Sequence, residues 1–327
     1  MIPKVLHYCF GMAADAGGKP WSLVHYVCLR SAIERIKPTD VFFYCEHEPT
    51  GPWWELSRGI VSVERIKAPR EIFGNPVVHQ AHRADVVRLE KLLSRGGIYL
   101  DVDVFVHGSF DQLLGHATVL GKQVVDETIV GLCNAVILAE PQAPFLKRWY
   151  SEYRSFRSKG QDAFWDEHAV KVPYQLSKQF PEEITVLPHY AFFWPTLKTE
   201  DLALIFDSAR PIDLSKTYAT HLWETLTWEP YLEHLSPRRV RAVDSNFHRW
   251  VRPMIASLPD SYGAPSVAAR FARRVRQLKR RVRSAVPLWA TRAKRKILNW
   301  AHVVLCGWSV VALALPAMTS VFEELVP

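Results

Sequence analysis

Cysteine is scarce in this 327-residue chain and never forms a recognisable redox or metal-binding motif. Its spacing includes no C-x-x-C and its total is odd: Cys9, Cys28, Cys45, Cys133 and Cys306. This pattern argues against a disulfide framework and against a structural zinc site. It fits a reducing compartment.

The N-terminus lacks the basic segment and long apolar run that a secretory signal requires. It opens instead with a strand-like sequence, IPKVLHYCF at residues 2–10. We therefore expect the catalytic part of the protein to stay in the cytoplasm. The chain also shows no internal repeat.

Acidic residues are missing from one long stretch, because no Asp or Glu lies between Ser261 and Phe322. Twelve Arg or Lys residues lie within that stretch, between Arg270 and Lys296. The first 260 residues hold the other 29 of the 41 basic residues and 31 of the 33 acidic ones. The formal net charge of +8 therefore belongs to the tail alone.

The basic tail has an apolar stripe at helical spacing, formed by Phe271, Val275, Leu278, Val282 and Trp289. Arginines cover the other face, which is typical of a cationic amphipathic helix on an anionic membrane surface. A solvated basic helix packed on the domain is the alternative. Nucleic-acid binding through the arginines is disfavoured, because an apolar stretch adjoins them.

That apolar stretch runs from Val303 to Phe322, twenty residues without a formal charge. It is long enough to cross a bilayer, but Gly307 and Pro316 interrupt it. A spanning helix, a re-entrant hairpin and an embedded amphipathic segment all remain open. If it spans, its basic flank predicts a catalytic domain at the cytoplasmic face of a membrane, C-terminally anchored or peripheral.

The first 250 residues alternate strand and helix signals, which indicates an α/β layer architecture. Three segments follow: a catalytic domain over 1–255, a basic amphipathic helix over 256–296 and a hydrophobic membrane-associated segment over 297–327. Strands are expected at 5–10, 41–46, 60–66, 98–106 and 134–139, and helices at 20–36, at 78–94 and after Pro144.

The most informative stretch is a hydrophobic strand that carries two aspartates, GGIYLDVDV at residues 96–104. Alternate strand residues share a face, so Asp101 and Asp103 would present their oxygens on one side. Burying both carboxylates is unfavourable without a cation nearby. The pair therefore predicts Mg²⁺ or Mn²⁺ bound together with a diphosphate, and a structural strand edge is the alternative.

Asp85 and Arg88 lie three residues apart, on one face of the helix that precedes this strand. An ordinary intrahelical ion pair is the simplest interpretation. The functional one starts from the cation and the arginine beside one diphosphate, which suggest a nucleotide-activated substrate. Asp85 would accept hydrogen bonds from sugar hydroxyls, while Arg88 would contact a phosphate or hydroxyl of that donor. Arginine suits this role because its fork matches phosphate oxygens.

The block HRADVVRL at 82–89 with GGIYLDVD at 96–103 resembles the core of the D-x-D glycosyltransferases with the sugar-binding-region motif. That family includes yeast initiating α-1,6-mannosyltransferase, inositol-phosphoceramide mannosyltransferase and α-1,4-galactosyltransferase. The opening residues 2–7, the segment 134–141 and the segment 221–228 are similar to other parts of the family. The resemblance covers roughly residues 2–230. It departs at Ala84, where many members have Ser, and does not explain the basic tail.

The resemblance implies a GT-A fold, with a Rossmann-like mixed sheet flanked by helices, and retention of anomeric configuration. It also implies a UDP- or GDP-sugar donor and Mn²⁺ or Mg²⁺. A membrane-attached tail favours a lipid-linked glycan, a glycolipid or a polysaccharide precursor as acceptor over a soluble sugar. No nucleic-acid partner is expected.

The resemblance also assigns roles to individual residues. Asp85 and Arg88 would hold the donor sugar with His7 and Tyr99 nearby, Asp101 and Asp103 would bind ribose and metal, Asn134 would face the sugar or acceptor, His221 would be a further metal ligand or phosphate contact, and Trp228 would cover the nucleotide. A surface histidine and a core tryptophan are the alternatives for the last two. Which aspartate contacts the metal directly stays open.

Two other functions fit parts of the sequence. The segment LDVDV at 100–104 matches the nucleophile motif of haloacid-dehalogenase-like phosphatases, although that fold places its nucleophile on an early strand. A non-catalytic membrane-surface adaptor would use the basic tail and treat the α/β domain as a scaffold.

Overall fold

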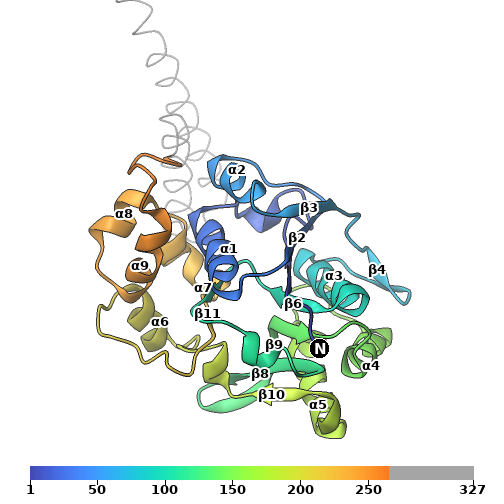
Figure 1. The fold of residues 1–327 in the computed structure, drawn as a ribbon. Helices are drawn as coiled ribbons and strands as arrows, with labels where there is room; N and C mark the ends of the chain where they lie inside the picture. Colours follow the sequence, from blue (N-terminus) through green and yellow to red (C-terminus); the bar gives the residue numbers. More distant parts are fainter. Residues whose placement is uncertain (265–327) are drawn as a thin grey trace, which may run out of the picture. The chain divides into compact units, whose positions relative to one another are not determined.

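A mixed β-sheet forms the centre of the part of the chain that the computed structural model describes, residues 1–264 (Figure 1). The strands are β1 (Val5–Cys9), β2 (Asp40–Cys45), β3 (Ser62–Arg65), β4 (Glu71–Ile72), β5 (Asn75–Pro76), β6 (Gly97–Leu100), β7 (Val104–Val106), β8 (Thr118–Val125), β9 (Thr128–Ala139), β10 (Thr185–Leu187) and β11 (Ala219–His221). The helices are α1 (Leu23–Ile36), α2 (Pro52–Arg58), α3 (Gln80–Arg95), α4 (Pro144–Glu152), α5 (Val172–Gln179), α6 (Thr199–Phe206), α7 (Glu224–Thr227), α8 (Pro237–Ala242) and α9 (Asn246–Val251).

The central sheet has seven strands in the order β10-β8-β9-β6-β1-β2-β3. Strand β1 pairs in parallel with β2 and β6, whereas β9 runs antiparallel to both β6 and β8. Two antiparallel ribbons accompany the sheet, β7 with β11 and β4 with β5. This mixed sheet flanked by helices confirms the expected α/β fold class.

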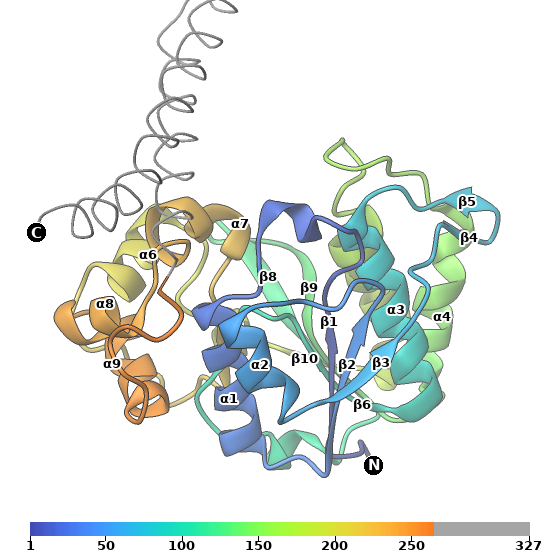
Figure 2. The same cartoon turned by 90° about the horizontal axis from the view of Figure 1, so that it is seen from above.

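Helices cover both faces of the sheet, and each face has its own hydrophobic core (Figures 1 and 2). Successive side chains of strand β1 point to opposite faces of the sheet and so contribute to both cores. Leu6 and Tyr8 pack on the side of α1, and Cys9 packs on the side of α3 and α4. The cysteines of the described part, Cys133 included, are buried and form no disulfide.

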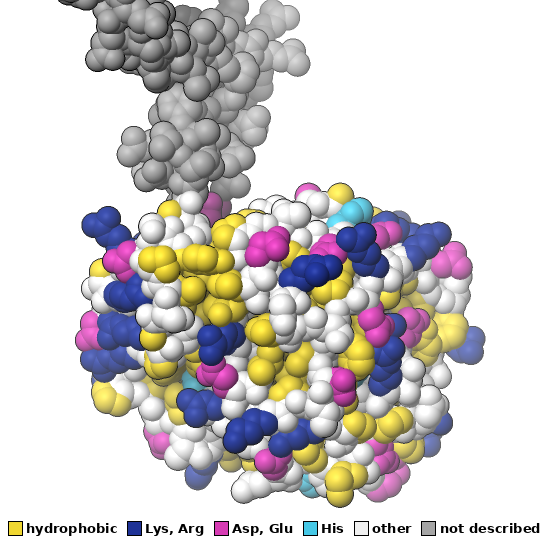
Figure 3. Space-filling model, turned by 45° about the horizontal axis from the view of Figure 1, so that its top comes forward, with side chains coloured by type: hydrophobic (Ala, Val, Ile, Leu, Met, Phe, Trp, Pro, Cys, Tyr) yellow, Lys and Arg dark blue, Asp and Glu magenta, His cyan; other side chains and the backbone are white. Residues whose placement is uncertain are grey.

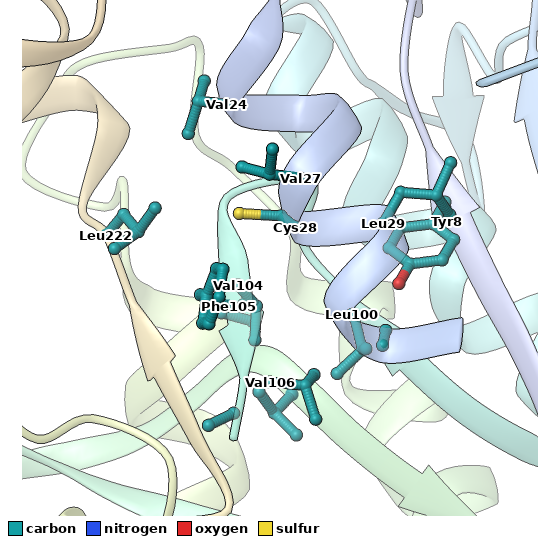
Figure 4. Close-up of a cluster of buried hydrophobic side chains, with 14 of the residues drawn as sticks. Tyr8, Val24, Val27, Cys28, Leu29, Leu100, Val104, Phe105, Val106 and Leu222 are labelled. Atoms are coloured by element: carbon teal, nitrogen blue, oxygen red, sulfur yellow. The ribbon is translucent and has the colours of Figure 1, made fainter. Parts of the chain in front are cut away.

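Strand β7 lies against helix α1 in the hydrophobic core on the α1 side of the sheet, which we call the first core (Figure 4). Val27 and Cys28 of α1 face Val104 and Phe105 across this contact. The hydroxyl of Ser31 accepts a hydrogen bond of 2.9 Å from the Val106 amide. The contact fixes the chain that follows the two aspartates.

The single strand expected over 98–106 is wrong. Strand β6 ends at Leu100, a turn follows at residues 101–103, and β7 leaves the sheet to pair with β11. The Val104 amide donates to the Asp101 carbonyl at 3.1 Å and closes the turn. The two aspartates therefore meet across a turn and not along one face of a strand.

The helix expected from Pro20 begins later, at Leu23. Ser22 is its N-cap, and its amide donates to Nδ1 of His25 at 3.0 Å. A proline at the first helical position would have been equally suitable, but this side-chain cap fixes the start.

One compact unit runs from Met1 to Gly263, whereas the expected first domain covers 1–255. The Tyr262 hydroxyl donates to the Pro52 carbonyl at 2.9 Å, and its ring packs edge-on against Trp53. The expected amphipathic helix over 256–296 lies outside the described residues from 265 onward, and the expected apolar segment over 297–327 lies wholly outside them. In the described part, no helix is long and apolar enough to cross a membrane.

The surface of the described unit carries both signs of charge. On the face drawn in Figure 3, basic and acidic side chains are interspersed. This agrees with the near balance of charge that the sequence gives for the first 260 residues.

His7 is a buried histidine whose neutral form stabilises the fold. Its side chain has no exposed surface, its Nδ1 lies 2.9 Å from the Tyr44 hydroxyl, and its Nε2 lies 2.8 Å from the Gly96 carbonyl oxygen. Burial lowers the pKa of His7 from 6.5 to about 4. The unfolded chain therefore binds a proton at a higher pH than the folded one does.

The stabilisation from neutral His7 should be complete above about pH 6.5 and lost as the pH falls toward 4. We expect the free energy of unfolding in urea to fall over this range, and His7→Gln to remove about 3 kcal/mol of that fall. His47→Gln, at an exposed histidine, is the control and should keep the wild-type slope. An unchanged slope in His7→Gln would contradict the assignment.

Candidate active site

The two aspartates sit where β6 leaves the sheet. The Asp101 amide donates to the Ala135 carbonyl at 2.8 Å, so the start of the turn is tied to β9. Asp103 is buried, with 6% of its surface exposed, whereas Asp101 is partly exposed. Both carboxylates lie at the end of the strand where β1 and β2 also end, because β1 is parallel to β6 and β2.

A buried guanidinium joins these aspartates to helix α3. Arg88 lies 3.2 Å from the carboxylate of Asp101 and 3.2 Å from that of Asp85. Its Nη1 also donates to the carbonyl of Asn134 at 2.7 Å. The ring of Tyr99 lies beneath the guanidinium at 4.3 Å, and its hydroxyl donates to Asp101 at 2.8 Å.

A β-bulge aims Asn134 at this group. Leu120 of β8 pairs with Ile137, but the next residue, Gly121, pairs with Cys133. Residues 134–136 therefore have no partner on β8, and a bulge of this kind re-aims side chains. The side-chain amide of Asn134 donates to Oδ1 of Asp85 at 2.7 Å.

The ribbon of β7 and β11 brings a histidine to the same place. Its register sets His221 opposite Val104, so Nε2 of His221 lies 3.2 Å from Oδ2 of Asp103. One ligand atom from each of Asp101, Asp103 and His221 lies within 4.8 Å of the others. Two carboxylates and an imidazole form a donor set that suits a divalent cation.

The electrostatics of the site differ between its carboxylates. Burial raises the pKa of Asp85, but the Arg88 charge and hydrogen bonds from His82 and Asn134 outweigh it and hold the pKa below its usual range. Burial likewise raises the pKa of Asp101, and there the opposing Arg88 charge does not compensate. Asp85 is therefore held as a carboxylate.

Asp103 and His221 form a charged pair. Burial opposes the ionised form of Asp103, but the His221 charge, the His221 hydrogen bond and the Glu224 amide lower its pKa. Burial alone would lower the pKa of His221, and Asp103 raises it well above the usual value. A divalent cation bound here would replace the proton on His221, because a metal ligand must be neutral imidazole.

The chain after β11 closes the site. Trp223 has a φ of 53°, in the left-handed region that is unusual for a bulky residue. This turn directs the Glu224 amide to Oδ2 of Asp103, 2.8 Å away. The Glu224 carboxylate lies 2.8 Å from Nε2 of His25 and 3.3 Å from Nζ of Lys19.

Known proteins resemble this chain. Residues 37–120 match the family model described as glycosyltransferase sugar-binding region containing DXD motif. Glucan organizing enzyme 1 from Cryptococcus neoformans var. grubii serotype A is 36% identical over 270 residues, which cover 80% of this chain and 72% of that protein. The chain belongs to this glycosyltransferase family. Family membership sets aside the phosphatase and the non-catalytic adaptor.

Solved glycosyltransferases are among the structures found to be similar to this chain, at low sequence identity. The apo bifunctional glycosyltransferase WbbM is 14% identical with a TM-score of 0.44, over 79% of this chain and 50% of that one. The galactosyltransferase LgtC, with donor and acceptor sugar analogues, is 13% identical with a TM-score of 0.35, over 67% of this chain and 87% of that one. The family assignment rests on the sequence relative and not on these structures.

The glycosyltransferase brings most of the expected residues together. One hydrogen-bonded or ion-paired group contains Asp85, Arg88, Tyr99, Asp101 and Asn134, and a second contains Asp103 and His221. Tyr99 is 1% exposed and supports Arg88 from below, so the structure shows it positioning other side chains. Trp228 lies at one edge of the site, where its ring stacks on His25 at 6.2 Å.

His7 does not join the site. Its ring is fully buried between Phe42 and Tyr44, and both of its nitrogens are used within the protein. It has no atom left to offer a nucleotide-sugar. The donor-binding assignment of His7 is therefore corrected to a structural one.

Three residues of the site carry no expectation from the sequence. His82 lies 3.2 Å from Asp85, one helical turn before it, and that spacing could have revealed it. His25 and Glu224 are 199 residues apart, so no local pattern links them. The two side chains come together because α7 packs near the N-terminal region in the tertiary structure.

Removing the buried guanidinium should be costly for stability. We expect Arg88→Met to lower the free energy of unfolding by about 3–5 kcal/mol, because it leaves the buried carboxylate of Asp85 and the partly exposed carboxylate of Asp101 without their partner. Arg157→Met removes an exposed ion pair with Glu167 and should cost about 1 kcal/mol or less. Urea unfolding measures both, and equal losses would contradict a special role for Arg88.

Proposed function

We propose that this glycosyltransferase moves a hexose from a UDP- or GDP-sugar to a membrane-associated glycan or lipid-linked acceptor. The supporting observation is the meeting of Asp101, Asp103 and His221 beside the buried Arg88. Such a site offers three cation ligands, and one of them, Asp101, also pairs with the positive charge of Arg88. This is the combination that a departing diphosphate needs.

Asp101, Asp103 and His221 would hold the Mn²⁺ or Mg²⁺. The donor set fits because its ligand atoms already converge and Nε2 of His221 faces Asp103. The bound cation would neutralise charge that builds on the departing nucleotide diphosphate.

Asp85 and Arg88 would orient the donor sugar. The carboxylate of Asp85 contacts Asn134, Arg88 and His82. Because a carboxylate accepts about four hydrogen bonds, one acceptor position remains for a sugar hydroxyl. Arg88 keeps its charge, because the neighbouring carboxylates outweigh burial and raise its pKa. Trp228 would cover the nucleotide from the closing segment.

The reaction itself would need little from a side-chain base. The bond between the sugar and the diphosphate breaks, and the acceptor hydroxyl oxygen forms a new bond to the sugar on the same face. The hydroxyl proton passes to a phosphate oxygen of the departing nucleotide. This course retains the anomeric configuration.

The acceptor is proposed from two indications. The basic and apolar sequence after residue 264 favours an acceptor at the cytoplasmic face of an anionic membrane. The relative is named a glucan organizing enzyme, which agrees with a role in polysaccharide synthesis. Glycolipids and lipid-linked glycans belong to the same chemical class of acceptor.

A screen of UDP- and GDP-sugars tests the function directly. We expect Mn²⁺-dependent release of free UDP or GDP from one of them, because slow transfer to water accompanies donor activation. Chelation of the metal should abolish the release. Turnover of p-nitrophenyl phosphate without any nucleotide release would contradict the proposal.

Asp103→Asn tests whether the proposed metal site is needed for activity. The variant should lose Mn²⁺-dependent nucleotide release and bind Mn²⁺ at least about tenfold more weakly, because one charged ligand is gone. Asp111→Asn changes an exposed aspartate that pairs with Lys4 and should leave both measurements unchanged. Retained activity in Asp103→Asn would reject the site.

A further inference from the structure

A glycine-containing segment crosses the end of the sheet between α3 and α7. This strap (11–19) includes a short 3₁₀ turn, Ala16–Gly18, and Figure 2 shows it along the edge of the fold between those two helices. On the α3 side, Nη1 of Arg83 donates to the Met12 carbonyl at 3.0 Å. Gly17 has a φ of 69°, and a Cβ there would collide with the side chain of Gln80.

The strap ends on the α7 side at Lys19. Its Nζ lies 3.3 Å from Oε2 of Glu224 and 5.8 Å from the centre of the Trp228 ring. A quarter of the Lys19 side chain, 25%, is exposed. The side chain is therefore partly accessible, and Glu224 is its ion-pair partner among the contacts described.

Glu224 connects this ammonium to the metal-ligand group. Its amide donates to Asp103 at 2.8 Å, so Lys19 is separated from Asp103 by a single residue. The second carboxylate oxygen of Glu224 is 2.8 Å from Nε2 of His25, which fixes the carboxylate from the other side. The arrangement holds a lysine beside the place where the cation would bind.

Arg88 is not free to neutralise a diphosphate by itself. Its guanidinium already bonds to Asp85, Asp101 and the Asn134 carbonyl, and Tyr99 covers one face. A departing nucleotide diphosphate carries more negative charge than one divalent cation balances. A lysine is a compact charge on a flexible stem and can move onto phosphate oxygens.

We propose that Lys19 binds the diphosphate of the donor, exchanging its contact with Glu224 for phosphate oxygens. Gly17 and Gly18 precede it with φ values of 69° and 78°, backbone conformations that glycine adopts without strain. Glu224 and His25 are positioning residues that keep Lys19 at the site before the donor arrives. The inference rests on the proposed use of a nucleotide-sugar.

Calorimetric binding of nucleotides to the full-length protein in Mn²⁺ tests this role. The probes are UDP, GDP, UMP and GMP. We expect Lys19→Met to weaken binding of the diphosphate about tenfold, equivalent to about 1.4 kcal/mol, and to leave binding of the matching monophosphate unchanged. Lys19→Arg should recover most of the loss.

Lys4→Met is the matched control. Like Lys19, Lys4 pairs with one carboxylate, here that of Asp111, and its side chain is 28% exposed, but it precedes β1 at the opposite end of the sheet. Its nucleotide binding should equal that of the wild type. Thermal unfolding of Lys19→Met should match that of Lys4→Met, which excludes a folding defect as the cause.

The outcomes distinguish failure of the proposed function from failure of the role of Lys19. If the wild type binds no nucleoside diphosphate in Mn²⁺, the proposed function fails and the role of Lys19 fails with it. If the wild type binds and Lys19→Met binds equally well, the role of Lys19 alone is rejected. An equal loss of mono- and diphosphate would assign Lys19 a purely structural role and also overturn the inference.

Discussion

The site depends on one buried guanidinium. Arg88 holds a charge almost out of contact with water, and such a charge is tolerated only when its neighbours compensate it. The carboxylates of Asp85 and Asp101 and the carbonyl of Asn134 do so, and they come from α3, the end of β6 and β9. Arg88 therefore links these three elements at the D-x-D turn.

The second half of the site is held by backbone pairing. The ribbon of β7 and β11 places His221 beside Asp103, and the turn at Trp223 then directs an amide to the same carboxylate. Packing of β7 on α1 holds this ribbon, so the first core and the site share one support (Figure 4). The metal-ligand group thus joins His221 to two aspartates that lie far before it in the chain.

Local patterns predicted a large part of this arrangement. The helical spacing of Asp85 and Arg88 and the strand before Asp101 were read correctly, because neighbouring residues alone fix which way those side chains point. The same reasoning was wrong for Val104, which leaves the sheet. The role of His7 came from the family resemblance, and there the tertiary structure buries the ring and uses both of its nitrogens within the protein.

The sequence by itself determined the parts: an α/β unit, an acidic pair at a strand end, a helix with a paired aspartate and arginine, and a basic tail. The tertiary structure decided the partners. The bulge at residues 134–136 aims Asn134, and the meeting of His25 with Glu224 spans 199 residues. Such contacts depend on register and on turn geometry far along the chain, so no short stretch of sequence contains them.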